Sequence, residues 1–286
     1  VAHCWFTDDP YAALCFWDYA TPDAQTALLM YEMEYESSWC KNSNKKLPVP
    51  KDRDYFPFQK AGIEYALRRR NTLIGDQPGL GKTVQAIGVA NALDMNRVLV
   101  LCPASVRLQW RQEILGWSTK APYPSTHVIL KGSDSVSTQA HYTILSYDLL
   151  RNDAIRRNLA RMEWDMLVLD EAHYLKNYSA QRTKAVFTGV GRKDSDDYTP
   201  PIADQCGKII GLTGTPLPNR PRECYTITRG LCWEAIDGVS QDSFTHRYNP
   251  SAAMPTGKVI EKTGRLPELQ NRLRCNFMVR RMKTEV

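Results

Sequence analysis

A short apolar stretch that ends at Ile74 is followed by a glycine-rich loop and then by an apolar segment of helical length. The loop, residues 75–83, reads Gly-Asp-Gln-Pro-Gly-Leu-Gly-Lys-Thr. Glycines let backbone N–H groups approach phosphate oxygens closely, and the positive end of a following helix faces the same oxygens. Lys82 would neutralise terminal phosphates, and the Thr83 hydroxyl would coordinate Mg²⁺. The loop therefore predicts a nucleotide-binding set of Gly79, Leu80, Gly81, Lys82, Thr83 and Val84.

The loop departs from the pattern G-x-x-x-x-G-K-[ST] at one position. Asp76 stands where the pattern has glycine. The alternative interpretation is an ordinary glycine turn that joins a strand to a helix. We prefer phosphate binding because the order of strand, glycine loop and helix is the one that phosphate binding requires.

A pair of acids follows the apolar run 166–169. Asp170 and Glu171 come directly after it, and Ala172-His173 completes the string Asp-Glu-Ala-His. Asp170 would hold the hydration shell of Mg²⁺ opposite Thr83, and Glu171 would orient and deprotonate an attacking water. Hydrolysis of a phosphoanhydride needs mainly positioning and charge neutralisation, so Lys82, a metal held by Asp170, and the base Glu171 form a coherent minimum catalytic set. A solvated acidic helix start is the alternative, and the presence of the glycine loop argues against it.

These residues can meet only if the strands before them lie in one sheet. Apolar runs of strand length occur at 72–74, 98–101, 127–130, 142–145, 166–169 and 208–212. Segments of helical character lie between them, at 58–69, 82–93, 105–115 and 179–188. This alternation predicts an α/β fold in which helices cover both faces of a parallel sheet. Ligands of such sheets bind at the carboxyl ends of the strands. The segment 190–207 is predicted to be a long polar loop.

Composition excludes several classes of protein. With 43% hydrophobic and 24% charged residues, the chain can fill a core and is not expected to be disordered. It has no uncharged apolar run near the roughly 18 residues that span a bilayer. Its eight cysteines include no CxxC pair, so reduced thiols are favoured over disulfides or a metal site. No secretion signal is evident at the start of the sequence, and we expect an intracellular protein without a membrane.

Charge and aromatic residues separate the first 50 residues from the rest. This segment carries seven acids and three lysines, although the whole chain has a net charge of +6. The basic remainder is compatible with a polyanionic partner. Nine aromatic residues lie within residues 1–46. They could stack on bases, but the acidic balance favours an accessory unit packed against the main domain. We therefore divide the chain into an N-terminal accessory segment and linker, 1–50, and a main domain, 51–286.

In their order along the chain, these motifs resemble the first motor lobe of a superfamily-two helicase, and more narrowly of the Swi/Snf-type DNA translocases. The resemblance runs from about residue 55 to the last residue. It includes the carboxylate motif at 169–177 and the segment at 277–283 that closes the family's first lobe. The resemblance implies a RecA-like parallel sheet flanked by helices, the fold of a P-loop NTPase lobe, with a small aromatic-rich N-terminal accessory segment.

Other motifs of this family are matched residue by residue. The string Phe-Gln-Lys-Ala-Gly at 58–62 resembles the upstream glutamine motif, which implies that Gln59 reads the adenine edge. A surface glutamine on an amphipathic helix is the alternative. Residues 98–105 resemble the segment that contacts the DNA backbone, so Ser105, and with it Arg107, would meet phosphate, whereas Trp110 is expected to pack. Residues 212–216 resemble the third motif, which links the state of ATP to the grip on DNA. Its members are Thr213, Gly214 and Thr215, with which His173 would form a bond.

The resemblance implies an ATP hydrolase that uses ATP and Mg²⁺ and moves on double-stranded or branched DNA. Residues 6–11 are also similar to the segment that precedes the motor in small relatives that rewind branched DNA, the annealing-helicase-like branch. The arginines that a second motor lobe supplies are not found after Arg281, so we expect that lobe to be absent from this sequence and the chain to be weakly active by itself. We expect a monomer that is cytoplasmic in a bacterium or phage and nuclear in a eukaryote. Two alternatives stay open: the lobe of an RNA helicase, and a nucleotide-gated nucleic-acid-binding module without turnover.

Overall fold

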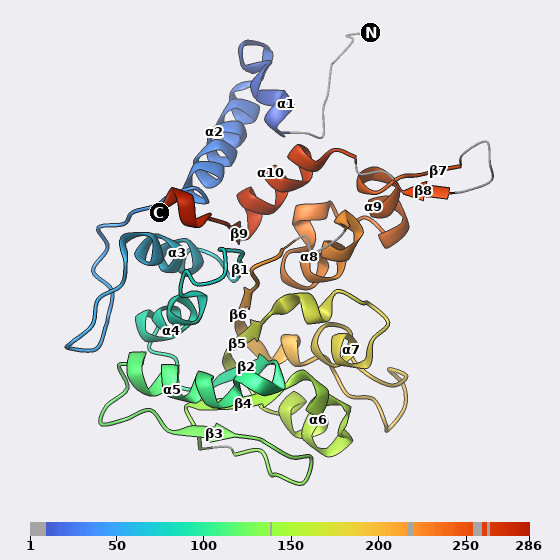
Figure 1. Ribbon diagram of the computed structural model, residues 1–286. Coiled ribbons are helices and arrows are strands. Elements are labelled where there is room, and N and C mark those ends of the chain that lie inside the picture. The colour runs from blue at the N-terminus through green and yellow to red at the C-terminus, as the bar shows by residue number, and fades with distance from the viewer. Residues whose placement is uncertain (1–9, 138, 217–219, 254–258, 262–263) are drawn as a thin grey trace.

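The structure is a computed structural model of the chain, and it describes residues 10–137, 139–216, 220–253, 259–261 and 264–286 (Figure 1). Residues 6–9, which carry most of the resemblance to the annealing-helicase-like branch, lie outside these ranges. Within them, every helix is too short or too polar to cross a membrane. Seven cysteines fall in the described ranges, and all seven are free thiols.

A sheet of seven parallel strands forms the centre of the molecule. Its strands are β1 (Asn71–Ile74), β2 (Val98–Cys102), β3 (Thr126–Val128), β4 (Tyr142–Ser146), β5 (Trp164–Asp170), β6 (Cys206–Leu212) and β9 (Met278–Val279). They lie in the order β3-β4-β2-β5-β6-β1-β9, and every pair is parallel. This is the predicted RecA-like sheet. Because β6 separates β1 from β5, the segments that follow these three strands emerge side by side at one edge.

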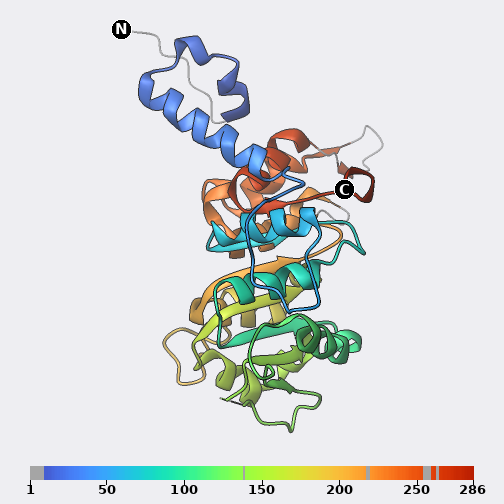
Figure 2. The same cartoon turned by 90° about the vertical axis from the view of Figure 1, so that its left-hand side faces the viewer.

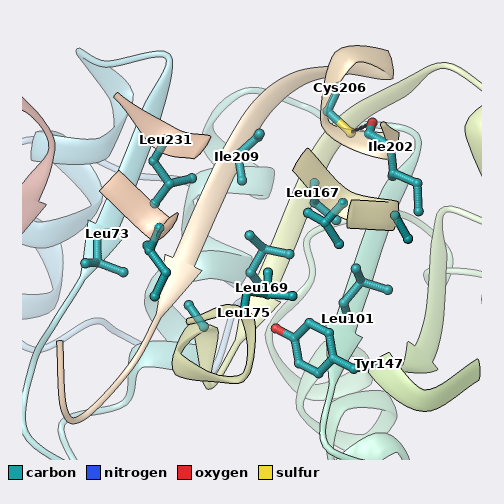
Figure 3. Packing of buried hydrophobic residues seen from close by; sticks show 14 of the residues in the cluster. Leu73, Leu101, Tyr147, Leu167, Leu169, Leu175, Ile202, Cys206, Ile209 and Leu231 are labelled. Carbon is teal, nitrogen blue, oxygen red and sulfur yellow. Dashed lines mark hydrogen bonds between the residues drawn. The ribbon is translucent and has the colours of Figure 1, made fainter. Parts of the chain in front are cut away.

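The strands are buried on both faces of the sheet. Successive residues of a strand pack in different apolar clusters, one on each face. In β2, Val98, Val100 and Cys102 pack in one apolar cluster, whereas Leu99 and Leu101 pack in the other. Figure 3 shows one of these clusters, in which Leu101, Leu167 and Ile209 come from adjacent strands. This explains why the strands read as continuous apolar runs rather than as alternating patterns.

Helices cover each face of the sheet (Figure 1). On one side lie α3 (Pro57–Leu67), α4 (Lys82–Ala92) and α5 (Arg107–Trp117), and their buried residues belong to the cluster of Val98. On the other side lie α6 (Asp153–Ala160), α7 (Gln181–Phe187) and α8 (Tyr225–Leu231), and their buried residues belong to the cluster of Leu99. The layers are therefore those of a doubly covered α/β lobe.

The N-terminal segment forms two helices, α1 (Pro10–Leu14) and α2 (Pro22–Ser37), which extend away from the sheet (Figure 2). The hydroxyl of Thr21 caps α2 by accepting from the Ala24 N–H. The far end of α2 contacts the lobe, because Glu34 pairs with Arg69 and the Arg274 guanidinium lies 3.5 Å from the centre of the Trp39 ring. These contacts are those of a packed element, and they engage Trp39 with a protein cation.

The last part of the chain returns to the sheet. It forms α9 (Gln241–Tyr248), a small antiparallel hairpin of β7 (Ser251–Ala253) and β8 (Val259–Glu261), then α10 (Leu266–Asn276) and β9. β9 pairs with β1 and was not predicted as a strand. The segment 190–207 is not loop throughout: Val190 and Thr199 form an isolated bridge, Ile202 is buried, and β6 begins at Cys206.

Candidate active site

The glycine loop leaves β1 at Gly75 and enters α4 at Lys82. Gly79 and Gly81 adopt φ values of 89° and 68°, which residues with a side chain rarely adopt. Gly81 is the N-cap of α4, so the N–H groups of Lys82, Thr83 and Val84 form the first turn and have no partner inside the helix. Three adjacent donors at the positive end of a helix can bind an anion, and phosphate binding by this loop stays a prediction.

Lys82, the first residue of α4, lies at the edge of the sheet where β1, β6 and β5 end. Its Nζ donates to the backbone carbonyl oxygens of Asp76 (2.9 Å) and Gln77 (3.5 Å). Burial lowers the pKa of Lys82, and the negative charges of Glu171, Asp76 and Asp170 oppose this change. The lysine of the loop and the two acids that follow β5 are therefore within electrostatic reach of one another.

Asp170 is the last residue of β5, and its carboxylate is held at both oxygens. Trp110 Nε1 donates to Oδ2 at 2.8 Å, and the Glu171 N–H donates to Oδ1 at 3.0 Å. Tyr147 fixes the backbone at the same point, because its hydroxyl donates to the Asp170 carbonyl oxygen at 2.8 Å. Burial raises the pKa of Asp170, whereas the bond from Trp110 lowers it and the charge of Glu171 raises it further. A nearby cation would relieve this buried charge.

Glu171 has a left-handed backbone, with φ 48° and ψ 55°. A residue with a Cβ pays about 1–2 kcal/mol for this conformation, and such strain gathers at functional sites. Its carboxylate lies 3.1 Å from His173 Nδ1. The same nitrogen is 3.4 Å from Thr213 Oγ1, which is the contact between His173 and the Thr-Gly-Thr turn that the sequence predicted.

The Thr-Gly-Thr turn follows β6, between the two other segments. Thr213 is buried and its Oγ1 accepts from the Thr215 N–H at 3.1 Å. A Cβ on Gly214 would stand 2.9 Å from Pro78 Cγ, so the turn lies directly against the glycine loop. Arg280 joins them, since its Nη1 donates to the carbonyl oxygens of Gly75 (3.0 Å) and Gly214 (3.3 Å). The three strand ends thus share one connected edge.

Asp76, which departs from the loop pattern, forms a buried ion pair. Its Oδ2 lies 2.6 Å from Arg281 Nη2, and both side chains are fully buried. Arg281 also donates to Asp76 Oδ1 through its N–H (2.9 Å) and its Nε (3.0 Å). Gln85 completes the set, because its Nε2 donates to Asp76 Oδ2 and its Oε1 accepts from Arg281. Asp76 therefore fastens the loop to the segment after β9.

Gln59 is buried in the first turn of α3, close to the loop. Its Oε1 accepts from the Phe56 N–H at 3.0 Å, and its Nε2 donates to the Leu80 carbonyl oxygen at 3.4 Å. These bonds link α3 to the glycine loop. One N–H and one lone pair of the amide are not used in these two bonds, so reading of adenine by Gln59 stays a prediction.

Ser105 lies beyond the end of β2 in a short 3₁₀ turn, Ala104–Val106, and is exposed to solvent. Arg107 has contacts inside the protein, and its contact with phosphate stays a prediction. Its guanidinium donates to the carbonyl oxygens of Ala104, Ile129 and Leu130, and so anchors the start of α5.

Thr83 and Asp170 fit the predicted magnesium site by the chemistry of their donors. Mg²⁺ takes oxygen ligands and keeps several waters, so one hydroxyl and one carboxylate beside phosphate oxygens are sufficient. The Thr83 side chain is half-buried, and so is that of Asp170, whose Oδ2 accepts from Trp110. No cluster of three or more His, Cys, Asp or Glu side chains that could hold a metal occurs in the described ranges.

Sequence reasoning missed Trp110, Asp76, Gln85 and Arg281 as parts of this edge. Trp110 was interpreted as packing, and it also bonds to Asp170. The signal for Asp76 was its departure from the loop pattern, but its partner is 205 residues away. No spacing rule connects residues that far apart.

Comparison with solved structures identifies the fold. The SWI2/SNF2 ATPase core of Sulfolobus solfataricus in complex with dsDNA aligns with a TM-score of 0.61 at 22% identity, covering 84% of this chain and 47% of that one. The same core without DNA in its description aligns with a TM-score of 0.60 at 24% identity, covering 84% and 45%. Both support the RecA-like architecture.

Curated relatives agree in sequence. The chain is 32% identical over 232 residues to a SWI/SNF-related matrix-associated actin-dependent regulator of chromatin subfamily A-like protein 1 from Xenopus tropicalis, covering 80% of this chain and 23% of the relative. It is 32% identical over 240 residues to the DNA annealing helicase and endonuclease ZRANB3 from Bos taurus, covering 80% and 21%. The chain thus spans only about a fifth to a quarter of the length of these relatives.

The family profile described as SNF2-related domain matches residues 31–193, more than half of the chain. The matched range contains the glycine loop, the acids after β5 and the helices between them. With the fold and the connected edge, this match shows that the chain belongs to the SNF2-related domain family.

Proposed function

We propose that this lobe binds ATP with Mg²⁺ and takes part in its hydrolysis. One observation carries the proposal: β1, β6 and β5 are neighbours, so that Lys82 lies within electrostatic reach of Asp170 and Glu171. The first-turn N–H groups of α4 would bind the phosphates, with Lys82 as their counter-charge. Thr83 and Asp170 would hold the metal, which supplies charge neutralisation for the phosphoanhydride.

Glu171 is the base in this proposal. Its carboxylate is partly exposed, adjoins the metal carboxylate and is 3.1 Å from His173. A carboxylate in this position can orient a water and accept its proton. His173 and Thr213 then connect the base to the turn after β6, so a change in the nucleotide would reach that turn through two contacts. Gln59 would recognise the adenine from the other side of the loop.

We further propose double-stranded or branched DNA as the substrate on which ATP hydrolysis drives movement. The relatives' names describe a regulator of chromatin and a DNA annealing helicase, and one solved neighbour was described with dsDNA. In this chain, Ser105 is exposed at the carboxyl edge of β2, where a hydroxyl and the start of a helix can bind a DNA phosphate. The net charge of +6 favours such a partner. An intracellular location follows from this proposal.

The division of the chain into an accessory segment, 1–50, and a lobe, 51–286, belongs to the same proposal. We also propose that a second motor lobe is the partner that supplies arginines across the nucleotide. On this view the present chain binds nucleotide as a monomer and hydrolyses it slowly by itself.

The test of the nucleotide site uses two substitutions with different outcomes. Lys82→Ala removes the counter-charge of the phosphates, so ATP binding should fall below detection in a titration with a fluorescent ATP analogue. Glu171→Gln keeps the shape of the base and removes its charge, so binding should persist while turnover falls by about 10²-fold or more.

Lys184→Ala is the matched control, because Lys184 is an exposed lysine on α7 on the other side of the sheet. It should bind ATP like the wild type. Equal ATP affinity in the wild type and in Lys82→Ala would overturn the phosphate site.

A further inference from the structure

Trp110 makes one directed contact with the proposed metal site. It is a buried residue of α5, and its indole Nε1 donates to Asp170 Oδ2 at 2.8 Å. The two residues are 60 positions apart, one in α5 and the other at the end of β5. The rest of the ring packs in the same apolar cluster as Val100 and Val168.

The hydrogen bond from Trp110 fixes the orientation of the Asp170 carboxylate. The other oxygen, Oδ1, accepts from the N–H of the next residue, Glu171, a contact that belongs to the backbone itself. Trp110 is therefore the side chain that fixes the second oxygen. A carboxylate that accepts one bond at each oxygen is fixed in rotation, and about two of its four lone-pair sites remain for other ligands.

The helix that carries Trp110 is itself anchored. Arg107, at its first residue, donates to three backbone carbonyl oxygens. The indole N–H is thus presented from a fixed element rather than from a mobile side chain. Partners of this kind, one shell outside a metal ligand, tune metal affinity by roughly 10–100-fold.

We propose that Trp110 is a positioning residue for the magnesium carboxylate: its N–H holds Asp170 in the orientation that Mg²⁺ bound to ATP requires. The inference rests on the proposed function. The alternative is that the ring merely fills the core, and then the N–H contributes only to stability.

Trp110→Phe separates these two roles, because it keeps an aromatic ring and removes the N–H. ATP affinity would be measured across a range of Mg²⁺ concentrations and again in EDTA. We expect the Mg²⁺ concentration for half-maximal tightening to rise about 10-fold, while the affinity for metal-free ATP changes less than about twofold.

Trp164→Phe is the matched control. Trp164 is equally buried, lies at the opposite end of β5, and its Nε1 donates to the Leu159 carbonyl oxygen at 3.0 Å. It loses one indole hydrogen bond of the same kind, but far from Asp170. Its Mg²⁺ dependence should equal that of the wild type.

A second measurement on the unmodified chain does not depend on the folding of a variant. With ¹⁵N-labelled indoles, the Trp110 N–H resonance should shift when Mg²⁺ is added to the ATP-bound protein, and the Trp164 resonance should not. An unchanged Mg²⁺ dependence in Trp110→Phe, or an unmoved Trp110 resonance, overturns the inference. If the wild type binds ATP and loses it in Lys82→Ala, the proposed function survives that result.

Discussion

Asp76 stands where the loop pattern has glycine, and its carboxylate is fully paired inside the protein. Its carboxylate accepts from the backbone and the guanidinium of Arg281, and both side chains are fully buried. A buried charge that is paired and hydrogen-bonded is tolerated, whereas the same charge alone is costly. The pair therefore belongs to the structure of the loop rather than to its chemistry.

Asp76→Gly, which restores the common pattern of the loop, should destabilise this protein. Arg281 would keep its burial and lose its carboxylate, and breaking a buried pair in this way costs about 3–5 kcal/mol. Urea unfolding followed by circular dichroism measures the change. Asp54→Asn is the control, since Asp54 pairs with Lys60 at the surface with 70% of its side chain exposed. Surface pairs contribute about 0–1 kcal/mol. A fully stable Asp76→Gly protein would contradict the assignment.

At the residue scale, the sequence predicted the charged side chains of the candidate site. It did not predict the residues that hydrogen-bond to the site and hold it in place. Lys82, Asp170 and Glu171 could be named because each follows a strand in a recognisable order, and strand ends of a parallel sheet meet. Trp110 acts through one hydrogen bond, and Arg281 through several, to residues far along the chain. Such pairings follow from the packing of whole elements and leave no local pattern.

Among the elements, α3 lies unusually close to the side chains behind the loop. A Cβ at Gly62 would overlap Gln85 Oε1 and approach Arg281 Nη2. Glycine in a helix normally costs about 0.5–1 kcal/mol relative to alanine. Here the helix needs glycine, because α3 must approach α4 and the segment after β9 at once.

Gly62→Ala should therefore lower the free energy of unfolding by about 1–3 kcal/mol, the usual cost of overpacking, although helix propensity alone predicts a gain. Gly116→Ala in α5 is the control. A Cβ there meets the end of the exposed Arg53 side chain at 3.0 Å, which can move away. The control should be neutral or stabilised by up to about 1 kcal/mol. Thermal unfolding of both variants decides the sign, and a stabilised Gly62→Ala would exclude the crowding.

The predictability of the elements follows their length and burial. The six predicted strands are present because buried parallel strands are continuous apolar runs. β9 was missed since its pairing covers only Met278 and Val279, too short a run to be distinguished from the helix before it. α2 was missed as well, because an acidic and aromatic segment lacks the apolar stripe of a core helix.

At the scale of the whole molecule, the proposed nucleotide contacts lie at one edge of the sheet. The N-terminal helices extend away from the sheet (Figure 2). Every proposed catalytic group follows a strand of this lobe. An arginine supplied from another lobe is worth a factor of roughly 10³ or more in turnover. We therefore expect this chain to bind ATP but to hydrolyse it slowly.

Phosphate release by this chain, with or without duplex DNA, should be at least about 10³-fold slower than the roughly 10 s⁻¹ of a typical enzyme. Parallel assays of this chain with duplex DNA, single-stranded DNA and RNA separate the candidate functions. Stimulation by RNA alone would favour an RNA helicase, and binding without stimulation would favour a nucleotide-gated module. Rapid DNA-dependent turnover by this chain would show that no further lobe is needed.

The bonds between the glycine loop and the segment after β9 determine when the loop can reach its final structure during synthesis. Asp76 and Arg281 are 205 residues apart, and Gly75 and Gln77 also bond to the segment from Val279 to Arg281. During synthesis the glycine loop leaves the ribosome long before the segment 279–281, which holds it, has been made. Affinity for the nucleotide should thus appear in this lobe only after the segment 279–281 has been made and has bonded to the glycine loop.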